Sequence, residues 1–311
     1  MLEPRTAPID KACGEGLMPG AIAALARLGV DPPGTPLQGI RYIAGPREAE
    51  ARFPRGAGRG VRRIALQHAL DAAVADRGIP VHRERAEHIR LDGPDVAVGG
   101  RRARYLVGAD GLHSGVRRAA GLDLPTRGTA RYGLRRHYRL APWTDLIEVH
   151  WSREAEAYVT PVGPDTVGVA LLGGRRGAWP EQLARFPRVL SLLADAEPAS
   201  AVRGAGPLRQ RTAAVARGRV ALVGDAAGYI DAITGEGLSL GLAAAAALVE
   251  CLREDRLEDY PAAYRRVTWR TRALTRGMLA AAQVPALRRM IVPVASSVPA
   301  AYRSAVQVLA G

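Results

Sequence analysis

Aromatic residues, cysteines and lysines are all scarce in this sequence of 311 residues, and each scarcity excludes a class of protein. Aromatic side chains make up 5 % of the chain, and a nucleic-acid-binding surface usually interleaves aromatic with basic residues. No nucleic-acid partner is therefore expected. Cys13 and Cys251 lie far apart in the sequence and predict neither a disulfide framework nor a metal site. This cysteine usage favours a cytoplasmic protein.

Long apolar runs are scarce as well. The longest, from Leu238 to Val249, covers twelve residues, whereas a helix that spans a bilayer needs roughly 20. We expect no stable membrane insertion. The length is ample for a full hydrophobic core in one or two domains.

Arginine carries almost all of the net charge of +14, because Lys11 is the only lysine. Arginine in place of lysine, together with abundant alanine, glycine and proline, is typical of a GC-rich coding sequence. We attribute the basic character mainly to this bias, with some added attraction for ligands that carry phosphate groups.

The most informative segment runs from Arg219 to Leu242. Val220 to Val223 predict a buried strand that stops at Gly224-Asp225, and Gly235-Glu236-Gly237 precedes a helix that begins near Leu238. An aspartate after a strand can accept hydrogen bonds from sugar-like hydroxyl groups. A helix start offers unpaired N–H groups and a positive dipole end. The segment resembles the second flavin-binding motif of the FAD-dependent hydroxylase and geranylgeranyl-reductase superfamily.

This resemblance implies a role for each matching residue. Asp225, after Gly224, would hold the ribityl chain of FAD. Gly235 and Gly237 would open the helix that continues from Leu238, and the start of this helix would face the pyrimidine end of the flavin ring. The alternative is an ordinary strand–loop–helix unit in which Gly and Asp serve only the turn.

A second motif lies between Tyr105 and Leu122. A short strand leads into a tight turn at Gly108 to Gly111, and Ser114 is a suitable N-cap for the helix that follows. The segment resembles the Gly-Ala-Asp-Gly-x-x-Ser-x-x-Arg motif of the same superfamily, matched here by Asp110, Gly111, Ser114 and Arg117. The resemblance implies that the aspartate lies near the pyrophosphate and helps to shape the groove for a nicotinamide cofactor. The two motifs follow one another in the order of the family.

Two further matches are weaker. Asp10 to Val30 resembles the Lys-x-Cys-Gly-x-Gly-Leu segment of the geranylgeranyl-reductase branch and implies that Cys13, a weak catalytic candidate, lies near the flavin. A small buried thiol in the core is the alternative. Arg63 matches a position where the family often presents an arginine to the cofactor, and a solvated arginine is the alternative.

One family feature is missing from the sequence, which has no strand followed by G-x-G-x-x-G. Met1 to Arg5 resembles the tail of the family's second strand, with Glu3 in the position that binds the adenosine ribose. We expect about thirty residues of the family's N-terminus to be absent. The explanation that we favour is a start codon assigned too far downstream; the alternatives are an incomplete fragment and a protein that has lost this unit. As written, the chain is expected to bind FAD weakly and to be poorly soluble.

The motif positions predict an α/β fold with an α+β insertion: a Rossmann-like FAD-binding domain, incomplete at its N-terminus, with an inserted antiparallel β-sheet substrate domain. The expected parts are FAD-binding segments 1–125 and 207–254, a substrate-binding sheet in 126–206 and C-terminal helices in 255–311. We expect strands at 131–140, 146–151, 157–162 and 166–172, and helices at 59–75, 179–194 and 258–283. A strand is expected at 78–82, and an apolar helix at 288–309 that prolines 293 and 299 break. That last helix would close the core, although an apolar cap over the site, a homodimer contact or a membrane-surface helix are alternatives.

The resemblance implies an FAD-dependent oxidoreductase that takes electrons from NADH or NADPH and then acts on a small apolar, aromatic or isoprenoid substrate. Two reactions stay open: reduction of a double bond, or hydroxylation by a monooxygenase. The glycine at 228, where hydroxylases usually carry histidine, favours a reductase. A truncated, inactive flavin-fold binding protein is a further alternative. His113 and His150 are expected to be surface residues rather than an acid or base.

Overall fold

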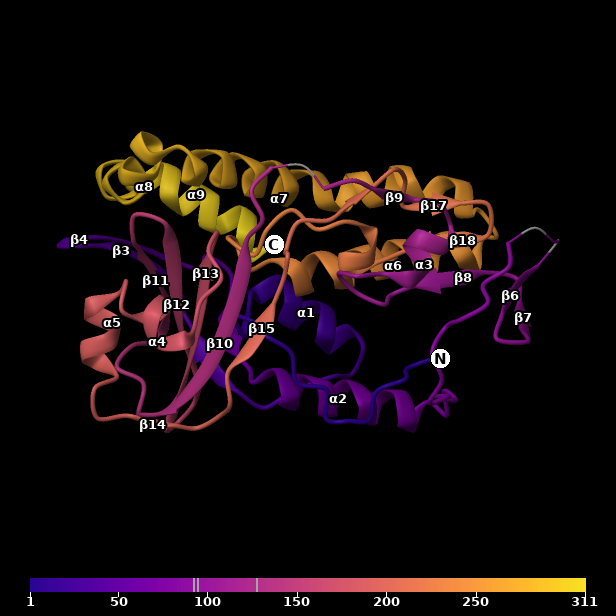
Figure 1. The fold of residues 1–311 in the computed structure, drawn as a ribbon, viewed down its shortest axis with the longest axis horizontal. Coiled ribbons are helices and arrows are strands. Elements are labelled where there is room, and N and C mark those ends of the chain that lie inside the picture. Colours follow the sequence, from indigo (N-terminus) through magenta and orange to yellow (C-terminus); the bar gives the residue numbers. More distant parts are fainter. Residues whose placement is uncertain (92, 94, 127) are drawn as a thin grey trace.

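The structure is a computed structural model, and it describes residues 1–311 except 92, 94 and 127. Its largest sheet has eight strands: β3 (Gly39–Ala44), β4 (Arg47–Arg52), β10 (Tyr132–Arg139), β11 (Leu146–Trp151), β12 (Ala155–Gly163), β13 (Thr166–Gly173), β14 (Glu197–Pro198) and β15 (Arg203–Ala205). Their order is β14-β10-β13-β12-β11-β3-β4, and β15 also pairs with β10. This sheet forms one end of an elongated molecule (Figure 1).

Strands β10 to β13 are antiparallel neighbours, as the sequence predicts for residues 126–206. Residues 163–165 make the turn between β12 and β13. Apolar side chains on one face of the sheet, among them Val159 and Val169, pack against two short helices. Those on the other face, among them Val149 and Leu172, point toward the C-terminal helices. The alternation of a strand therefore gives this sheet two buried faces.

Strands β3 and β4 were not predicted. They join the same sheet through β3, which runs parallel to β11 with Ile40 opposite Ile147. Their sequence, especially Arg47–Arg52, is rich in charge and lacks a clear apolar pattern. The large sheet therefore draws on residues 39–52 as well as on the segment predicted to form it, and the division of the chain into domains stays a prediction.

A smaller sheet at the other end of the molecule contains β8 (Leu106–Gly108), β18 (Val220–Leu222) and β17 (Ala216–Arg217). The strands β8 and β18 are parallel, with Gly108 opposite Leu222. The N–H of Val223 donates to the carbonyl of Gly108 at 3.0 Å. Because parallel strands end at the same edge, the two motif turns that follow them lie side by side.

The remaining elements surround these two sheets. Helices are α1 (Pro19–Arg27), α2 (Arg63–Asp76), α3 (Gly115–Ala119), α4 (Trp179–Leu183), α5 (Pro187–Leu192), α6 (Gly237–Arg253), α7 (Tyr260–Gln283), α8 (Pro285–Ser297) and α9 (Pro299–Ala310), with 3₁₀ turns η1 (Gly224–Ala227) and η2 (Leu257–Asp259). Short strands are β1 (Gly16–Leu17), β2 (Thr35–Leu37), β5 (Gly58–Gly60), β6 (Val96–Val98), β7 (Arg101–Ala103), β9 (Asp123–Leu124) and β16 (Arg211–Thr212).

Four predicted elements differ from the structure. The expected helix at 59–75 begins at Arg63 because Gly58–Gly60 pair in β5. The expected helix at 179–194 is split into α4 and α5, since Pro187 can begin a helix but cannot continue one. Residues 78–82 form only an isolated bridge from His82 to Leu2. Pro293 lies inside α8 without ending it, and Pro299 begins α9.

The C-terminal helices close the core over β3 and β4, as predicted. Val292, Tyr302 and Val306 are buried against Ile40 and Tyr42 of β3. The hydroxyl of Tyr302 donates to the carbonyl of Ile40 at 3.1 Å. In the described ranges, no helix is both long enough and apolar enough to cross a membrane. The observed architecture is a mixed α/β fold.

Candidate functional site

A cavity of about 800 Å³ lies between the large sheet and the two motif turns. Its volume is within the range of binding sites for small molecules and cofactors. Nine of the ten site residues that the sequence predicts line this cavity: Cys13, Arg63, Asp110, Gly111, Gly224, Asp225, Gly235, Gly237 and Leu238. The tenth, Glu3, is not among the lining residues and pairs with Arg5, with Oε2 and Nη2 2.7 Å apart.

The second turn presents a carboxylate beside a helix start. Gly224 has a φ of 58°, a backbone conformation that favours glycine, and it turns the chain from β18 into η1. Burial raises the pKa of Asp225 above its ordinary value, and Lys11 opposes that rise. A Cβ atom at Gly237 would lie 4.0 Å from Oδ1 of Asp225, so the carboxylate and the first turn of α6 are neighbours. Together they offer acceptors and unpaired N–H donors to one ligand.

In the first turn, the hydrogen bonds of Asp110 go mainly to other residues of the same turn. The hydroxyl of Ser114 donates to Oδ1 of Asp110, and the N–H of Val116 donates to Oδ2 at 3.1 Å. Ser114 is the N-cap of α3 and accepts from the N–H of Arg117 at 2.9 Å. Asp110 therefore fixes the shape of the turn that borders the cavity.

Arg117 ties the two turns together. Its side chain is 1 % exposed. It donates to the carbonyl of Leu112 at 3.0 Å and to that of Ala226 in η1 at 3.1 Å. It also donates to Asp123 at 2.7 Å and to Gln210 at 3.2 Å. One buried guanidinium thus satisfies acceptors from both motifs.

Three cationic side chains also line the cavity, Arg5, Lys11 and Arg63, and the charge of Lys11 interacts with that of Asp225. Burial, reinforced by the two arginines, lowers the pKa of Lys11 below its ordinary value. Nη1 of Arg63 is buried and has no hydrogen-bond partner among the described residues. A buried guanidinium nitrogen without an acceptor fits an anionic ligand group such as a phosphate. Sequence reasoning missed Arg5 and Lys11, although a single lysine in an arginine-rich chain was a signal.

Cys13 lies in the cavity wall beside a clamped loop. Burial, with a contribution from Glu15, raises the pKa of its thiol, which disfavours a nucleophilic thiolate. Glu15 has a φ of 60° and accepts from the N–H of Arg63 at 2.7 Å. Nε2 of His137 lies 2.6 Å from the other oxygen of Glu15. These contacts fasten residues 13–15 to both α2 and the large sheet.

The sheet side of the cavity is apolar. Ile40, Tyr42, Ile147, Val149 and Leu172 line it and belong to one hydrophobic cluster. The hydroxyl of Tyr158 donates to the carbonyl of Ile233 at 2.9 Å and so fastens β12 to the loop before α6. A ligand in this cavity therefore meets polar groups at the motif turns and apolar side chains at the sheet.

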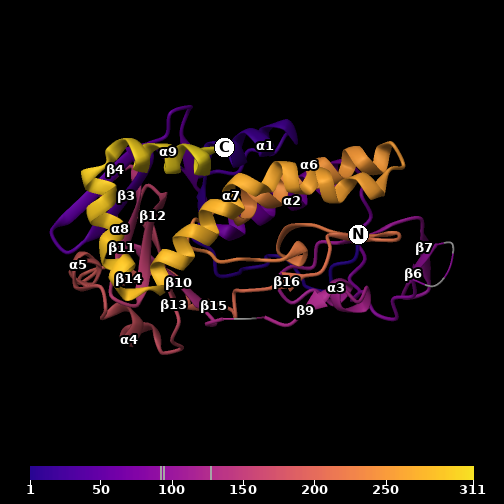
Figure 2. The same cartoon turned by 90° about the horizontal axis from the view of Figure 1, so that it is seen from above.

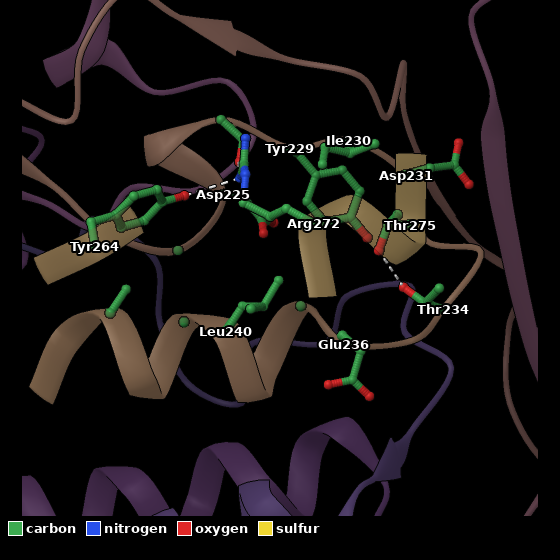
Figure 3. Close-up of a pocket in the computed structure, with 15 residues that line it drawn as sticks. Asp225, Tyr229, Ile230, Asp231, Thr234, Glu236, Leu240, Tyr264, Arg272 and Thr275 are labelled. Carbon is green, nitrogen blue, oxygen red and sulfur yellow. Dashed lines mark hydrogen bonds between the residues drawn. The ribbon is translucent and has the colours of Figure 1, made fainter. Parts of the chain in front are cut away.

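A second, smaller pocket of about 40 Å³ lies between η1, α6 and α7 (Figure 3). This volume has room for roughly three water molecules. Thr234 and Thr275 hydrogen-bond across it at 2.9 Å. Burial raises the pKa of Glu236 well above its ordinary value and raises that of Asp231 to about 6, although Arg131 opposes the latter. Two acids that sequence reasoning did not select thus have perturbed protonation beside the main cavity.

The two histidines differ in placement. His113 is exposed at the cavity rim, as expected. His150 is buried, and its Nε2 lies 3.1 Å from Oε2 of Glu148, so its prediction as a surface residue is wrong. The reason is that every residue of β11 is buried, including both polar side chains.

Comparison with known proteins identifies a family of flavin-binding proteins. The family model described as "FAD binding domain" matches residues 87–272, more than half of the chain. Dialkyldecalin synthase of Streptomyces rugosporus is 29 % identical over 214 residues, an alignment that covers 61 % of this chain and 46 % of the relative. Menaquinone reductase of Mycobacterium tuberculosis is 25 % identical over 283 residues, covering 78 % and 67 % respectively.

Among solved structures, the flavin-dependent halogenase CmlS superposes with a TM-score of 0.76 at 21 % identity. The match covers 90 % of this chain and 59 % of the halogenase, and it shows a shared fold. The chain therefore spans less than two thirds of the length of the synthase and of the halogenase.

Replacing Arg117 with lysine should weaken the junction of the two turns. Lysine keeps the charge but cannot reach four acceptors in the planar geometry of a guanidinium. We expect Arg117→Lys to lower the free energy of unfolding by about 2–4 kcal/mol, measured by urea denaturation. The matched control is Arg118→Lys, because Arg118 is exposed and, among the described residues, donates only to the carbonyl of His113. Equal effects of the two substitutions would contradict the assignment.

Asp231 should make stability depend on pH. The pKa of Asp231 is about 6 in the folded protein, against an ordinary value of 3.8. As the pH rises, the unfolded chain therefore loses this proton at a lower pH than the folded protein does. Stability should therefore fall as the pH rises from 3.8 through 6, by roughly 3 kcal/mol. We expect Asp231→Asn to gain stability relative to the native protein between pH 4 and pH 7 in urea titrations. A stability difference that is the same at both pH values would refute this.

Proposed function

The chain belongs to the FAD binding domain family, and on that premise we propose that it holds FAD in the main cavity and acts as an NAD(P)H-using oxidoreductase on an apolar substrate. The observation that carries the proposal is the meeting of the two motif turns. Asp225, the start of α6 and the cationic side chains all face one cavity whose opposite wall is apolar. In this proposal the small parallel sheet and its helices are a Rossmann-like FAD-binding half, and the large sheet is the substrate half.

Several polar groups of the cavity would take part in holding the cofactor. The carboxylate of Asp225 would accept hydrogen bonds from the ribityl hydroxyl groups. The unpaired N–H groups at Gly237 and Leu238 would donate to the electron-rich end of the flavin ring. Arg63 and Lys11 would neutralise phosphate charge, and Arg63 has a donor without an acceptor for that purpose.

When bound, FAD supplies the redox chemistry, which is the two-electron exchange between a nicotinamide and the substrate. The protein supplies position and electrostatics. The N–H groups and the positive dipole end of the first turn of α6 would stabilise negative charge on a bound flavin. The apolar wall of the large sheet orients a hydrophobic substrate and excludes water from the reacting groups.

Reduction is the reaction that we favour. Menaquinone reductase is the relative matched over the larger share of this chain, and the apolar sheet wall suits a lipid quinone or another isoprenoid substrate. The glycine at 228, where hydroxylases of this superfamily usually carry histidine, supports the same choice. Hydroxylation by a monooxygenase is the competing reaction, since both use the same cofactor site.

Asp225→Ala should weaken binding of FAD. The substitution removes the acceptor at the second turn, and we expect the affinity for added FAD to fall by at least about tenfold, the loss for one charge-assisted hydrogen bond. Quenching of flavin fluorescence on titration measures it. Asp195→Ala, at an exposed acid outside the cavity, is the matched control. Unchanged FAD affinity in Asp225→Ala would refute the cofactor assignment.

Anaerobic reduction separates the two reactions. The FAD-loaded protein, reduced with NADPH or NADH, should be reoxidised by menaquinone without oxygen and return one oxidised flavin per acceptor reduced. Flavin absorbance follows both half-reactions. Failure of menaquinone to reoxidise the flavin, together with an oxygen-dependent hydroxylated product, would establish the monooxygenase instead.

A further inference from the structure

Helices α7, α8 and α9 form a single layer along one side of the molecule (Figures 1 and 2). On its inner side, α7 packs against α6, while α8 and α9 pack on β4. Viewed from above in Figure 2, the three helices lie in the foreground, over the rest of the fold. Their outer sides therefore form one broad face of the protein.

Helix α8 exposes apolar side chains on this face and buries an arginine. Its arginine at 288 points inward, where it is 7 % exposed, pairs with Glu156 at 2.7 Å and donates to the carbonyl of Ala155 at 2.7 Å. Three of its apolar side chains point outward, whereas Val292 packs in the core: Leu287 is 53 % exposed, Met290 51 % and Val294 48 %. The outer side of a helix on a water-facing surface is normally polar. These exposed apolar side chains indicate that something apolar covers the outer side of α8.

Helix α7 adds a tryptophan surrounded by arginines. Trp269 is 58 % exposed, the most exposed of the four tryptophans. The guanidinium of Arg270 lies 5.5 Å from its ring. Arg265, Arg266 and Arg276 are exposed at helical spacings of four, three and seven residues from Trp269, so they lie on the same side of α7.

The charge of this layer has one sign. Residues 260–311 contain eight arginines and no aspartate or glutamate, so this short part of the chain carries eight of the fourteen net positive charges. Six of these arginines are exposed, so a second copy of the chain would bring six like charges against them and would be repelled. A covering partner has to be both anionic and apolar, which are the two properties of an anionic lipid surface.

We propose that the outer face of α7 and α8 docks on the surface of a bilayer that contains anionic lipid. Trp269, Leu287, Met290 and Val294 enter the headgroup region, and the arginines of α7 contact lipid phosphates. Leu309 of α9, in the same layer, lines the main cavity, so docking places that cavity close to a source of apolar substrate. The docking itself does not depend on which reaction the cavity performs.

Co-sedimentation of the full chain with lipid vesicles tests the proposal. We expect binding to vesicles of equal parts phosphatidylcholine and phosphatidylglycerol, weaker binding to phosphatidylcholine alone, and loss of binding as salt rises. Arg265→Gln and Arg266→Gln should each lower the partition coefficient about fivefold. The Leu287→Ser, Met290→Ser double variant should lower it by at least about tenfold.

Two matched variants are the controls. Arg85→Gln with Arg102→Gln removes two exposed charges outside this layer, and Leu190→Ser with Leu192→Ser removes two exposed apolar side chains on α5. Both should bind as the native protein does. Equal loss in control and test variants, or equal binding to neutral and anionic vesicles, would overturn the proposal.

Tryptophan fluorescence gives a reading that does not depend on sedimentation. Anionic vesicles should shift the emission to shorter wavelength, and the shift should vanish in Trp269→Phe but persist in Trp143→Phe, the next most exposed tryptophan at 37 %. A shift that persists in Trp269→Phe overturns the proposal. A second result would also overturn it: the native protein does not bind vesicles and forms a dimer in sedimentation analysis that Met290→Ser disrupts. A second copy of the chain would then cover the face.

Discussion

The contact on which this site depends is the buried guanidinium of Arg117. The guanidinium donates four hydrogen bonds. Two acceptors, on Leu112 and Asp123, are near Arg117 in the sequence, and the other two, on Gln210 and Ala226, are about a hundred residues later. The carbonyl of Leu112 belongs to the first motif and that of Ala226 to the second. Backbone carbonyls that face one another in a buried junction need a shared donor, and a planar side chain with five N–H bonds supplies it. The geometry of Asp225 and of the α6 start follows from this junction.

A second buried cluster has a similar role on the other side of the cavity. Glu156 is fully buried between Arg131 and Arg288, and Arg131 also lies 3.5 Å from Asp231. The cluster joins the large sheet, the loop before α6 and helix α8. Charges buried together are expensive to separate, so the cluster holds the apolar sheet wall of the cavity in one position relative to the motif turns. Buried polar contacts thus fix the positions of the two sides of the cavity relative to each other, whereas the sheet wall itself consists of apolar side chains.

The sequence was informative where chemistry is local. Asp110, Asp225 and Gly237 could be selected because a strand, a turn and a helix start occur within a few residues of one another, and all three line the cavity. The strands between 132 and 173 were predictable from their alternation and from the turn at 163–165.

Features that depend on distant contacts could not be predicted. Lys11 is placed by tertiary packing, since its neighbours Arg63 and Asp225 are far away in sequence. His150 is buried because Glu148 partners it within a strand that is covered on both faces. The strand Arg47–Arg52 has four charged side chains and becomes a strand only because β3 pairs with it.

The parallel pairing of β3 with β11 has a consequence for how the protein is made. The hairpin of β3 and β4 is complete once residue 52 has been synthesised, but its partner ends at Trp151. At a translation rate of about 5–20 residues per second, the open edge of β3 has to wait for many seconds beside the ribosome. During that interval the two glutamates and two arginines of Arg47–Arg52 keep the hairpin charged along its other edge and discourage association with neighbouring nascent chains.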